Sequence, residues 1–286
     1  EGILSEHHHD LFDIFCYAEV SQPDEVTKHF QSYVKHWCFT SGFSDLEVAQ
    51  RIQKDKIDIL VELCAGPTFN NRLNVFALKP APVQVSLYAL SVGLTTFDYR
   101  IVDSLLLTEE TRKLNIEKVF DLPSCFIVFK PIKPAPEITS LPLLKNGYVT
   151  FGSFNNLAKL NEHVLGLWAN ILRQIPGSHL VLKARSLRDP DIQEEFIQRF
   201  KSQGIVRNRL SLQGWMSDAA HLALYNEIDI ALDPFPYNGH ITSCEALWMG
   251  VPVITLHDSS CHDLGRAGVS LLTRLGLPEL IANSLE

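Results

Sequence analysis

The chain has 286 residues, 46% hydrophobic and 20% charged, which is the composition of an ordinary globular protein. This length suffices for one large domain or two of ordinary size. The formal net charge of −8 argues against a broad basic surface for nucleic acid. No apolar run reaches the roughly 18 residues that a membrane-spanning helix needs. We therefore expect a cytoplasmic or nucleocytoplasmic protein that partners neither nucleic acid nor membrane.

Cysteine and histidine positions predict no metal site. The six cysteines lie at irregular spacings without a CxxC pair, which favours small buried side chains in a reducing compartment. The histidine run at 7–9 and the pair His257 and His262 lack a carboxylate or thiolate set at ligand spacing. The N-terminus has no basic, signal-like region and does not begin with Met, so we expect a fragment of a longer protein.

The first half alternates apolar runs with helical patterns. The run at 12–18 predicts a buried strand, and Pro23-Asp24 opens an amphipathic stretch. Ser44 and Glu47 have the spacing of a capping box, which predicts a helix to about Lys56. Two continuous apolar runs predict strands buried on both faces, as in a parallel sheet, and they occupy residues 57–66 and 81–89.

A proline-rich segment divides the chain. Residues 130–147 contain four prolines and no periodic pattern, which is typical of a linker. We therefore predict an N-terminal domain over 1–130, a linker over 131–147 and a C-terminal domain over 148–286.

Strands and helices alternate regularly in the second half. Strands are predicted at YVTFGSF, HLVLKA, RLSLQG, DIALDPF and VPVITL, with helices between them that begin near Asn161, Asp189-Pro190, Ser217 and Ile241. Such alternation requires a parallel sheet covered by helices, so the predicted fold class is α/β, with two Rossmann-like doubly wound domains. Ligands of such sheets bind at the carboxyl ends of the strands.

The stretch LDPFPYNGHITSCEALWMGVPVITL (232–256) offers an anion site. The backbone N–H groups of Ile241, Thr242 and Ser243 would lie at a helix N-terminus, which suits a diphosphate. His240 could donate to the same phosphates, and Glu245 could accept both hydroxyls of a ribose. The alternative is structural, because Thr242 and Glu245 also have capping-box spacing, in which Glu245 reaches back to the backbone.

Two further candidates have equally plain alternatives. In TFGSFNNLAKL (150–160), Lys159 could stabilise charge on a leaving diphosphate, or it could be a solvated lysine beside two turn-forming asparagines. His221, on a predicted helix, is either a ligand contact or an ordinary surface or core histidine.

Together these stretches, with GVSLLTRLGLPELIA and IDILVELCAGPTFNNRLNVFALKPAPVQVS, resemble the catalytic region of the O-GlcNAc transferase and SPINDLY family, glycosyltransferase family 41. The resemblance implies a GT-B fold with the donor in the cleft between two Rossmann-like domains. It also implies metal-independent, inverting transfer of GlcNAc from UDP-GlcNAc to Ser or Thr of proteins, without a cofactor. Family members usually carry N-terminal tetratricopeptide repeats.

The resemblance gives each candidate residue a role. Lys159 matches the lysine that stabilises the leaving diphosphate, and Asn156 matches a position near the donor. His221 matches a histidine near the nucleoside. The segment His240, Ile241 and Thr242 matches the helix start that holds the diphosphate, and Glu245 matches the acid on the ribose.

The sequence also departs from the family pattern. Bacterial relatives have Gly-His-Thr where this chain has Gly66-Pro67-Thr68, and Pro67 has no ionisable group or backbone N–H. The loops at 89–93 and 256–266 differ as well. Three alternatives therefore stay open: a SPINDLY-type O-fucosyltransferase that uses GDP-fucose, a degenerate domain that binds a nucleotide or protein without catalysis, and a GT-B epimerase or small-molecule transferase.

Overall fold

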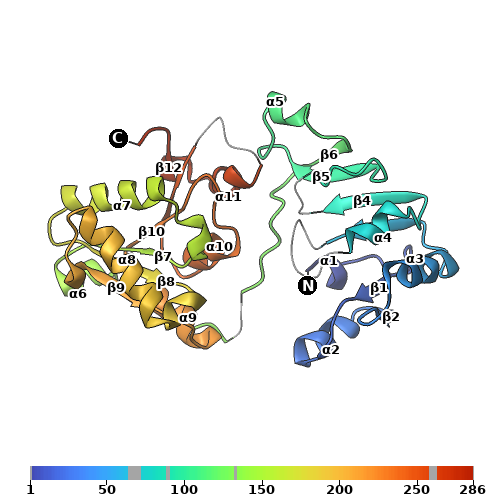
Figure 1. The fold of residues 1–286 in the computed structure, drawn as a ribbon, viewed down its shortest axis with the longest axis horizontal. Helices are drawn as coiled ribbons and strands as arrows, with labels where there is room; N and C mark the ends of the chain where they lie inside the picture. The colour runs from blue at the N-terminus through green and yellow to red at the C-terminus, as the bar shows by residue number, and fades with distance from the viewer. Residues whose placement is uncertain (1, 64–71, 88–90, 132–133, 258–262, 286) are drawn as a thin grey trace. The chain divides into compact units, whose positions relative to one another are not determined.

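The computed structural model describes residues 2–63, 72–87, 91–131, 134–257 and 263–285. The chain forms two compact units, 1–130 and 131–286 (Figure 1). Every strand pair in the described residues is parallel, and helices lie between the strands along the chain, so both units are α/β as predicted. No helix in these ranges is long and apolar enough to cross a membrane.

The first unit holds two parallel sheets. The smaller pairs β1 (Phe15–Ala18) with β2 (His36–Phe39), and the larger runs in chain order through β3 (Ile59–Glu62), β4 (Val83–Leu87), β5 (Tyr99–Asp103) and β6 (Lys118–Leu122). The helices are α1 (Gly2–Ser5), α2 (Glu25–Gln31), α3 (Asp45–Lys54), α4 (Leu73–Ala77) and α5 (Glu109–Arg112). Its core joins Ile52 of α3, Phe76 of α4 and Leu60 of β3.

Strand β3 is buried on one face, which corrects the prediction of burial on both. Leu60 and Glu62 are buried, whereas Ile59 and Val61 are 54% and 42% exposed. The two faces of β3 differ in burial because α3 and α4 pack on the face that carries Leu60. In β4 the prediction is confirmed, since the consecutive residues 84–86 are all buried.

Helix starts in both units follow the capping signals in the sequence. Ser44 accepts from the backbone N–H of Glu47, whose carboxylate accepts in turn from the N–H of Ser44, so the predicted capping box is confirmed. Asn161 caps the helix that follows β7, and Asp189 caps the helix that begins at Pro190. Each cap satisfies a backbone donor that the helix itself leaves free.

The second unit is built on one six-stranded sheet of order β12-β11-β10-β7-β8-β9. Its strands are β7 (Thr150–Ser153), β8 (His179–Lys183), β9 (Leu210–Gln213), β10 (Ile230–Leu232), β11 (Val253–Leu256) and β12 (Ile281–Ala282), the last of which we did not predict. Its helices are α6 (Pro142–Asn146), α7 (Glu162–Gln174), α8 (Pro190–Ser202), α9 (Asp218–Leu224), α10 (Ile241–Trp248) and α11 (Ala267–Arg274). This is the Rossmann strand order, which reverses between β7 and β10.

Helices cover both faces of this sheet. Along β8, Leu180 and Leu182 pack in the cluster that contains α7 and α8, whereas Val181 packs with residues of α9 and α10. Because successive side chains of a strand point to opposite faces, the two clusters lie on opposite sides of the sheet. The unit is therefore doubly wound.

The end of the predicted linker packs on the second unit. Helix α6 lies within 131–147, where the sequence predicts no periodic structure, and Gly147 ends it in the left-handed conformation. The buried carboxylate of Asp229 accepts from the backbone N–H groups of Leu143 and Thr150, both at 2.8 Å. Asp229 thus joins this segment to β7 and to the start of β10.

We expect Gly152→Ala to destabilise the second unit. A Cβ at Gly152 in β7 would lie 2.6 Å from Cδ1 of the buried Ile228, and such overpacking costs about 1–3 kcal/mol. The midpoint of urea unfolding measures the loss. Gly166→Ala in α7 is the control, because its Cβ meets nothing within 4 Å and the exchange favours helix by about 0.5–1 kcal/mol. Equal stability of the Gly152→Ala variant and the parent would contradict the close packing.

Candidate functional site

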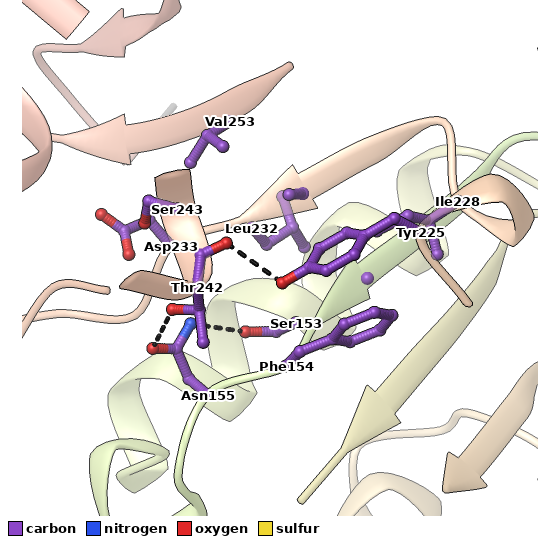
Figure 2. Close-up of a pocket in the computed structure, with 12 residues that line it drawn as sticks. Ser153, Phe154, Asn155, Tyr225, Ile228, Leu232, Asp233, Thr242, Ser243 and Val253 are labelled. Atoms are coloured by element: carbon purple, nitrogen blue, oxygen red, sulfur yellow. Dashed lines mark hydrogen bonds between the residues drawn. The ribbon is translucent and has the colours of Figure 1, made fainter. Parts of the chain in front are cut away.

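The polar residues that follow β7 and β10 meet at the point where the strand order reverses. β7 is followed by Phe154 and Asn155, and β10 is followed by Asp233. A small pocket of about 10 Å³, room for one water molecule, lies between these residues and the first turn of α10 (Figure 2). The carboxyl ends of strands at such a reversal are where ligands of this fold bind.

Lys159 connects the segments that leave the two strands. It ends a short 3-10 helix (Leu157–Lys159) after β7, and its Nζ donates to the carbonyl oxygen of Asn238 at 2.6 Å. The ammonium group also lies 4.2 Å from the ring centroid of Tyr237. Burial lowers the pKa of Lys159 to about 8, against the opposing charge of Asp233. Lys159 is therefore a partly buried cation at the site, which rules out the alternative of a solvated lysine.

Helix α10 presents free backbone donors beside Lys159. Its first intrahelical bond runs from Cys244 N to His240 O, so the N–H groups of residues 241–243 precede that bond. The Thr242 hydroxyl donates to Asn155 Oδ1 at 3.1 Å, which ties the helix start to the loop after β7 (Figure 2). The helix has no side-chain cap, so the alternative that Thr242 and Glu245 form a capping box is wrong.

Glu245 belongs to a second polar cluster on the same helix. Its Oε2 lies 2.9 Å from Nε2 of His221 on α9 and accepts from the hydroxyl of Tyr225 at 3.4 Å. The Tyr225 hydroxyl also donates to the backbone oxygen of Thr242 at 3.1 Å. Burial and the carboxyl of Glu245 raise the pKa of Tyr225, which keeps its proton. His221 therefore orients Glu245 and is not an ordinary surface histidine.

His240 is a neutral imidazole at the start of α10. It occupies the N-cap position, and its ring lies 5.8 Å from that of Tyr237. Burial, and secondarily the charge of Lys159, lowers its pKa to about 4. A neutral imidazole has one N–H that can donate to an anion without adding charge.

A wider groove of about 500 Å³ opens beside the small pocket, with Phe154 and Asn155 in the walls of both. Three cationic side chains line it at the end of β8 and in the segment that follows, those of Lys183, Arg185 and Arg188. Burial lowers the pKa of Lys183, whereas the charges of Glu245 and Asp218 act in the opposite direction. The groove is therefore cationic although the chain as a whole is acidic.

The predicted site residues come together with two qualifications. Asn156 lines the groove, but its side chain also accepts from Ala158 N at 3.0 Å, which is the turn-forming role of the alternative interpretation. Ile241 contributes its backbone, and its side chain is 50% exposed. Among the residues that the structure describes, no three His, Cys, Asp or Glu side chains gather where a metal ion could be held.

Sequence reasoning missed three contributors: Tyr225, Lys183 and Asp233. Asp233 had a signal, because it directly follows an apolar strand of the predicted sheet. Lys183 had the same signal, because it stands at the carboxyl end of the predicted strand HLVLKA, whereas Tyr225 acts through contacts with other elements and carries no local signal. Some expected departures lie outside the described residues: Pro67, residues 89–90 and residues 258–262.

Comparisons with solved structures confirm the fold class. A Thermobaculum terrenum O-GlcNAc transferase mutant superposes with a TM-score of 0.93 at 34% identity over 99% of this chain and 54% of that chain. Anabaena HepE, solved in complex with UDP and glucose, has a TM-score of 0.51 at 15% identity, covers 82% of this chain and 71% of its own, and shows the fold alone. The chain therefore has the GT-B fold class, and the position of a donor between the two units stays a prediction.

Sequence relatives point to the same family. The chain is 39% identical over 292 residues to a "probable UDP-N-acetylglucosamine–peptide N-acetylglucosaminyltransferase SPINDLY" of Arabidopsis thaliana, which covers 99% of this chain and 32% of the relative. It is 30% identical over 298 residues to the relative named SEC from the same plant, covering 100% of this chain and 30% of that protein. The chain spans about a third of these curated relatives. The model of glycosyl transferase family 41 matches residues 1–133 and 138–286, and the chain belongs to this family.

Proposed function

We propose that this chain is the catalytic region of an inverting protein O-glycosyltransferase that moves GlcNAc from UDP-GlcNAc to Ser or Thr of acceptor proteins. The observation that carries the proposal is the pairing of a free helix N-terminus with the partly buried cation Lys159, which meet at the strand reversal of the second unit. Family membership and the names of the relatives support it. Tetratricopeptide repeats in the full-length protein would present the acceptor.

The arrangement suits a diphosphate leaving group. The N–H groups of residues 241–243 and the neutral His240 would bind the phosphates, and Lys159 would stabilise the charge that develops as the sugar departs. Lys159 supplies the positive charge that a metal ion supplies elsewhere, and the N–H donors add hydrogen bonds, so the proposal includes no metal or cofactor.

The ribose would lie against Glu245. Its Oε2 is already engaged by His221 and Tyr225, which leaves Oε1 to accept from the sugar hydroxyls. From there the base would reach the groove that Asn156 and Lys183 line.

GDP-fucose is the second candidate donor. The chain is more similar to the SPINDLY relative, at 39% identity, than to SEC, at 30%, and resemblance to SPINDLY-type proteins also implies that donor. A groove of about 500 Å³ has room for a purine as well as for a pyrimidine.

Calorimetric titration of UDP, GDP, UDP-GlcNAc and GDP-fucose into the protein tests both donors. We expect one nucleotide pair to bind, and Lys159→Met and Glu245→Ala each to weaken the binding. Transfer of radiolabelled sugar to an acceptor protein then tests catalysis. Binding without transfer by the full-length protein would favour the degenerate domain, and no binding by a folded chain would overturn the proposal.

Donor affinity should fall above pH 8. Because burial lowers the pKa of Lys159 to about 8, the unliganded side chain loses its charge above that pH, and diphosphate binding must then be accompanied by proton uptake. We expect a loss approaching about tenfold per pH unit. Titrations between pH 6.5 and 9.5 measure it. In Lys159→Met, affinity should be lower at every pH and this dependence should vanish. A parent affinity that stays constant to pH 9.5 would contradict the role of Lys159.

Ribose hydroxyls should be recognised through Glu245. We expect the parent to bind 2′,3′-dideoxy-UDP or the matching GDP analogue about 10-fold or more weakly than the ribonucleotide, as for hydrogen bonds to a charged group. In Glu245→Ala the two nucleotides should bind nearly equally. Comparison of the four dissociation constants gives the coupling between side chain and hydroxyls. A discrimination that the substitution leaves intact would place the ribose elsewhere.

A further inference from the structure

We propose that Asp233 is a positioning residue that holds Lys159 and the turn before α10 in the geometry that donor binding requires. The inference deepens the proposed function and rests on it for the identity of the ligand. Asp233 touches no expected part of the donor, because its side chain is closed off from solvent at 5% exposure.

Two hydrogen bonds anchor the turn through this carboxylate. Oδ1 accepts from the backbone N–H of Gly239 at 2.6 Å, and Oδ2 accepts from the Thr255 hydroxyl at 2.8 Å. The backbone N–H of Asp233 itself donates to Ile254 of β11 at 3.0 Å. The turn that leads into α10 is therefore fixed to the sheet through Asp233.

Two glycines leave space for the carboxylate. A Cβ at Gly239 would lie 2.5 Å from the Ser243 hydroxyl and 3.1 Å from Asp233 Oδ1. A Cβ at Gly268, in the first turn of α11, would lie 2.7 Å from Asp233 Oδ2. A side chain at Gly268 would displace the carboxylate, whereas one at Gly239 would first meet the hydroxyls of Ser243 and Thr242 and would also press on the carboxylate.

The turn passes this constraint to Lys159. Asn238, next to Gly239, supplies the carbonyl oxygen that accepts from Lys159 Nζ at 2.6 Å. The Asn238 side chain is fixed as well, because its amide donates to Pro234 O at 3.0 Å and accepts from Gly268 N at 3.3 Å. Asp233 therefore sets the position of the Asn238 carbonyl oxygen, which accepts the hydrogen bond from Lys159.

Charge couples the two residues as well. Burial raises the pKa of Asp233 to about 7, and the opposing influences are the hydrogen bonds from Gly239 and Thr255 and the charge of Lys159. The charge of Asp233 in turn opposes the lowering of the lysine pKa by burial. Among the residues that the structure describes, the titratable groups on the surrounding elements include Lys159 after β7, Tyr237 and His240 before α10, and His257, Asp263 and Arg266 near β11 and α11.

Two substitutions of Asp233 separate the effect of its hydrogen bonds to the turn from the effect of its charge. Asp233→Asn keeps an oxygen that can accept from Gly239 and an amide that can donate to the Thr255 oxygen, but it removes the charge. Asp233→Ala removes both. Asp229→Asn is the matched control, because Asp229 is an equally buried carboxylate at the opposite end of β10, where it accepts from the backbone N–H groups of Leu143 and Thr150.

The first experiment follows the side-chain ¹³C signal of Lys159 by NMR during a pH titration of the unliganded protein, with Lys159→Met to identify the signal. We expect Asp233→Asn to lower the lysine pKa by about one unit, the scale of a nearby opposite charge, and Asp229→Asn to leave it unchanged. An unchanged lysine pKa in Asp233→Asn, or an equal shift in Asp229→Asn, would overturn the coupling.

The second experiment measures nucleotide binding at pH 7. We expect Asp233→Ala to bind the preferred nucleotide about tenfold or more weakly, the scale of a lost hydrogen bond to a charged group, and Asp229→Asn to bind it as the parent does. Thermal melting shows whether each variant folds. If Asp233→Ala does not fold, Asp233→Asn is the deciding variant. We expect its nucleotide affinity to fall at a lower pH than that of the parent, and an affinity equal to that of the parent at every pH would overturn the role of Asp233. If the parent binds no nucleotide, the proposed function fails, while the NMR result still decides the coupling.

Discussion

The hydrogen bond from Lys159 Nζ to the carbonyl oxygen of Asn238, 2.6 Å long, joins the two segments on which the site depends. These segments leave β7 and β10, neighbouring strands between which the order of the sheet reverses, so the chain continues to opposite sides of the sheet from each. A cation that is partly removed from water is costly unless it has partners. The carbonyl oxygen and the ring of Tyr237 provide them. A bound anion would further offset the desolvation of the Lys159 ammonium group. The free N–H groups of α10 lie where that anion would be held.

The polar groups of the second unit form two clusters with different tasks. In one, the oppositely charged side chains of Asp233 and Lys159 lie around the turn before α10, the first buried and the second partly buried. In the other, His221 and Tyr225 hold Glu245 on the first turns of the same helix. Because one cluster holds the turn that leads into α10 and the other lies on α10 itself, the distance between a bound phosphate and a bound ribose would be set by one rigid element. Preorganisation of this kind lets binding proceed without reorganising the site.

Local sequence signals predicted the framework well, because they depend on neighbouring residues. Asn161 and Asp189 cap their helices as expected, and the alternation of strands and helices gave the sheet of the second unit. The failures involve partners distant in sequence. The spacing of Thr242 and Glu245 matched a capping box, but His221 and Tyr225, some 20 residues earlier, engage the carboxylate instead. For β3, no local pattern could show that helices cover only the face of Leu60.

Asp233 illustrates why part of the site is visible only in three dimensions. In the sequence it is an acid at the end of an apolar run, which suggests a ligand contact at the edge of the sheet. In the structure its carboxylate points into the protein, between Gly239 and Gly268, residues separated by almost thirty positions. In the sequence, Gly239 alone indicates a turn, and Gly268 alone is an ordinary helix residue. In three dimensions both pack against the carboxylate and the hydroxyls around it. The acid reaches the cation that it does not touch through the turn, because it binds the N–H of Gly239 next to the carbonyl of Asn238 that Lys159 contacts.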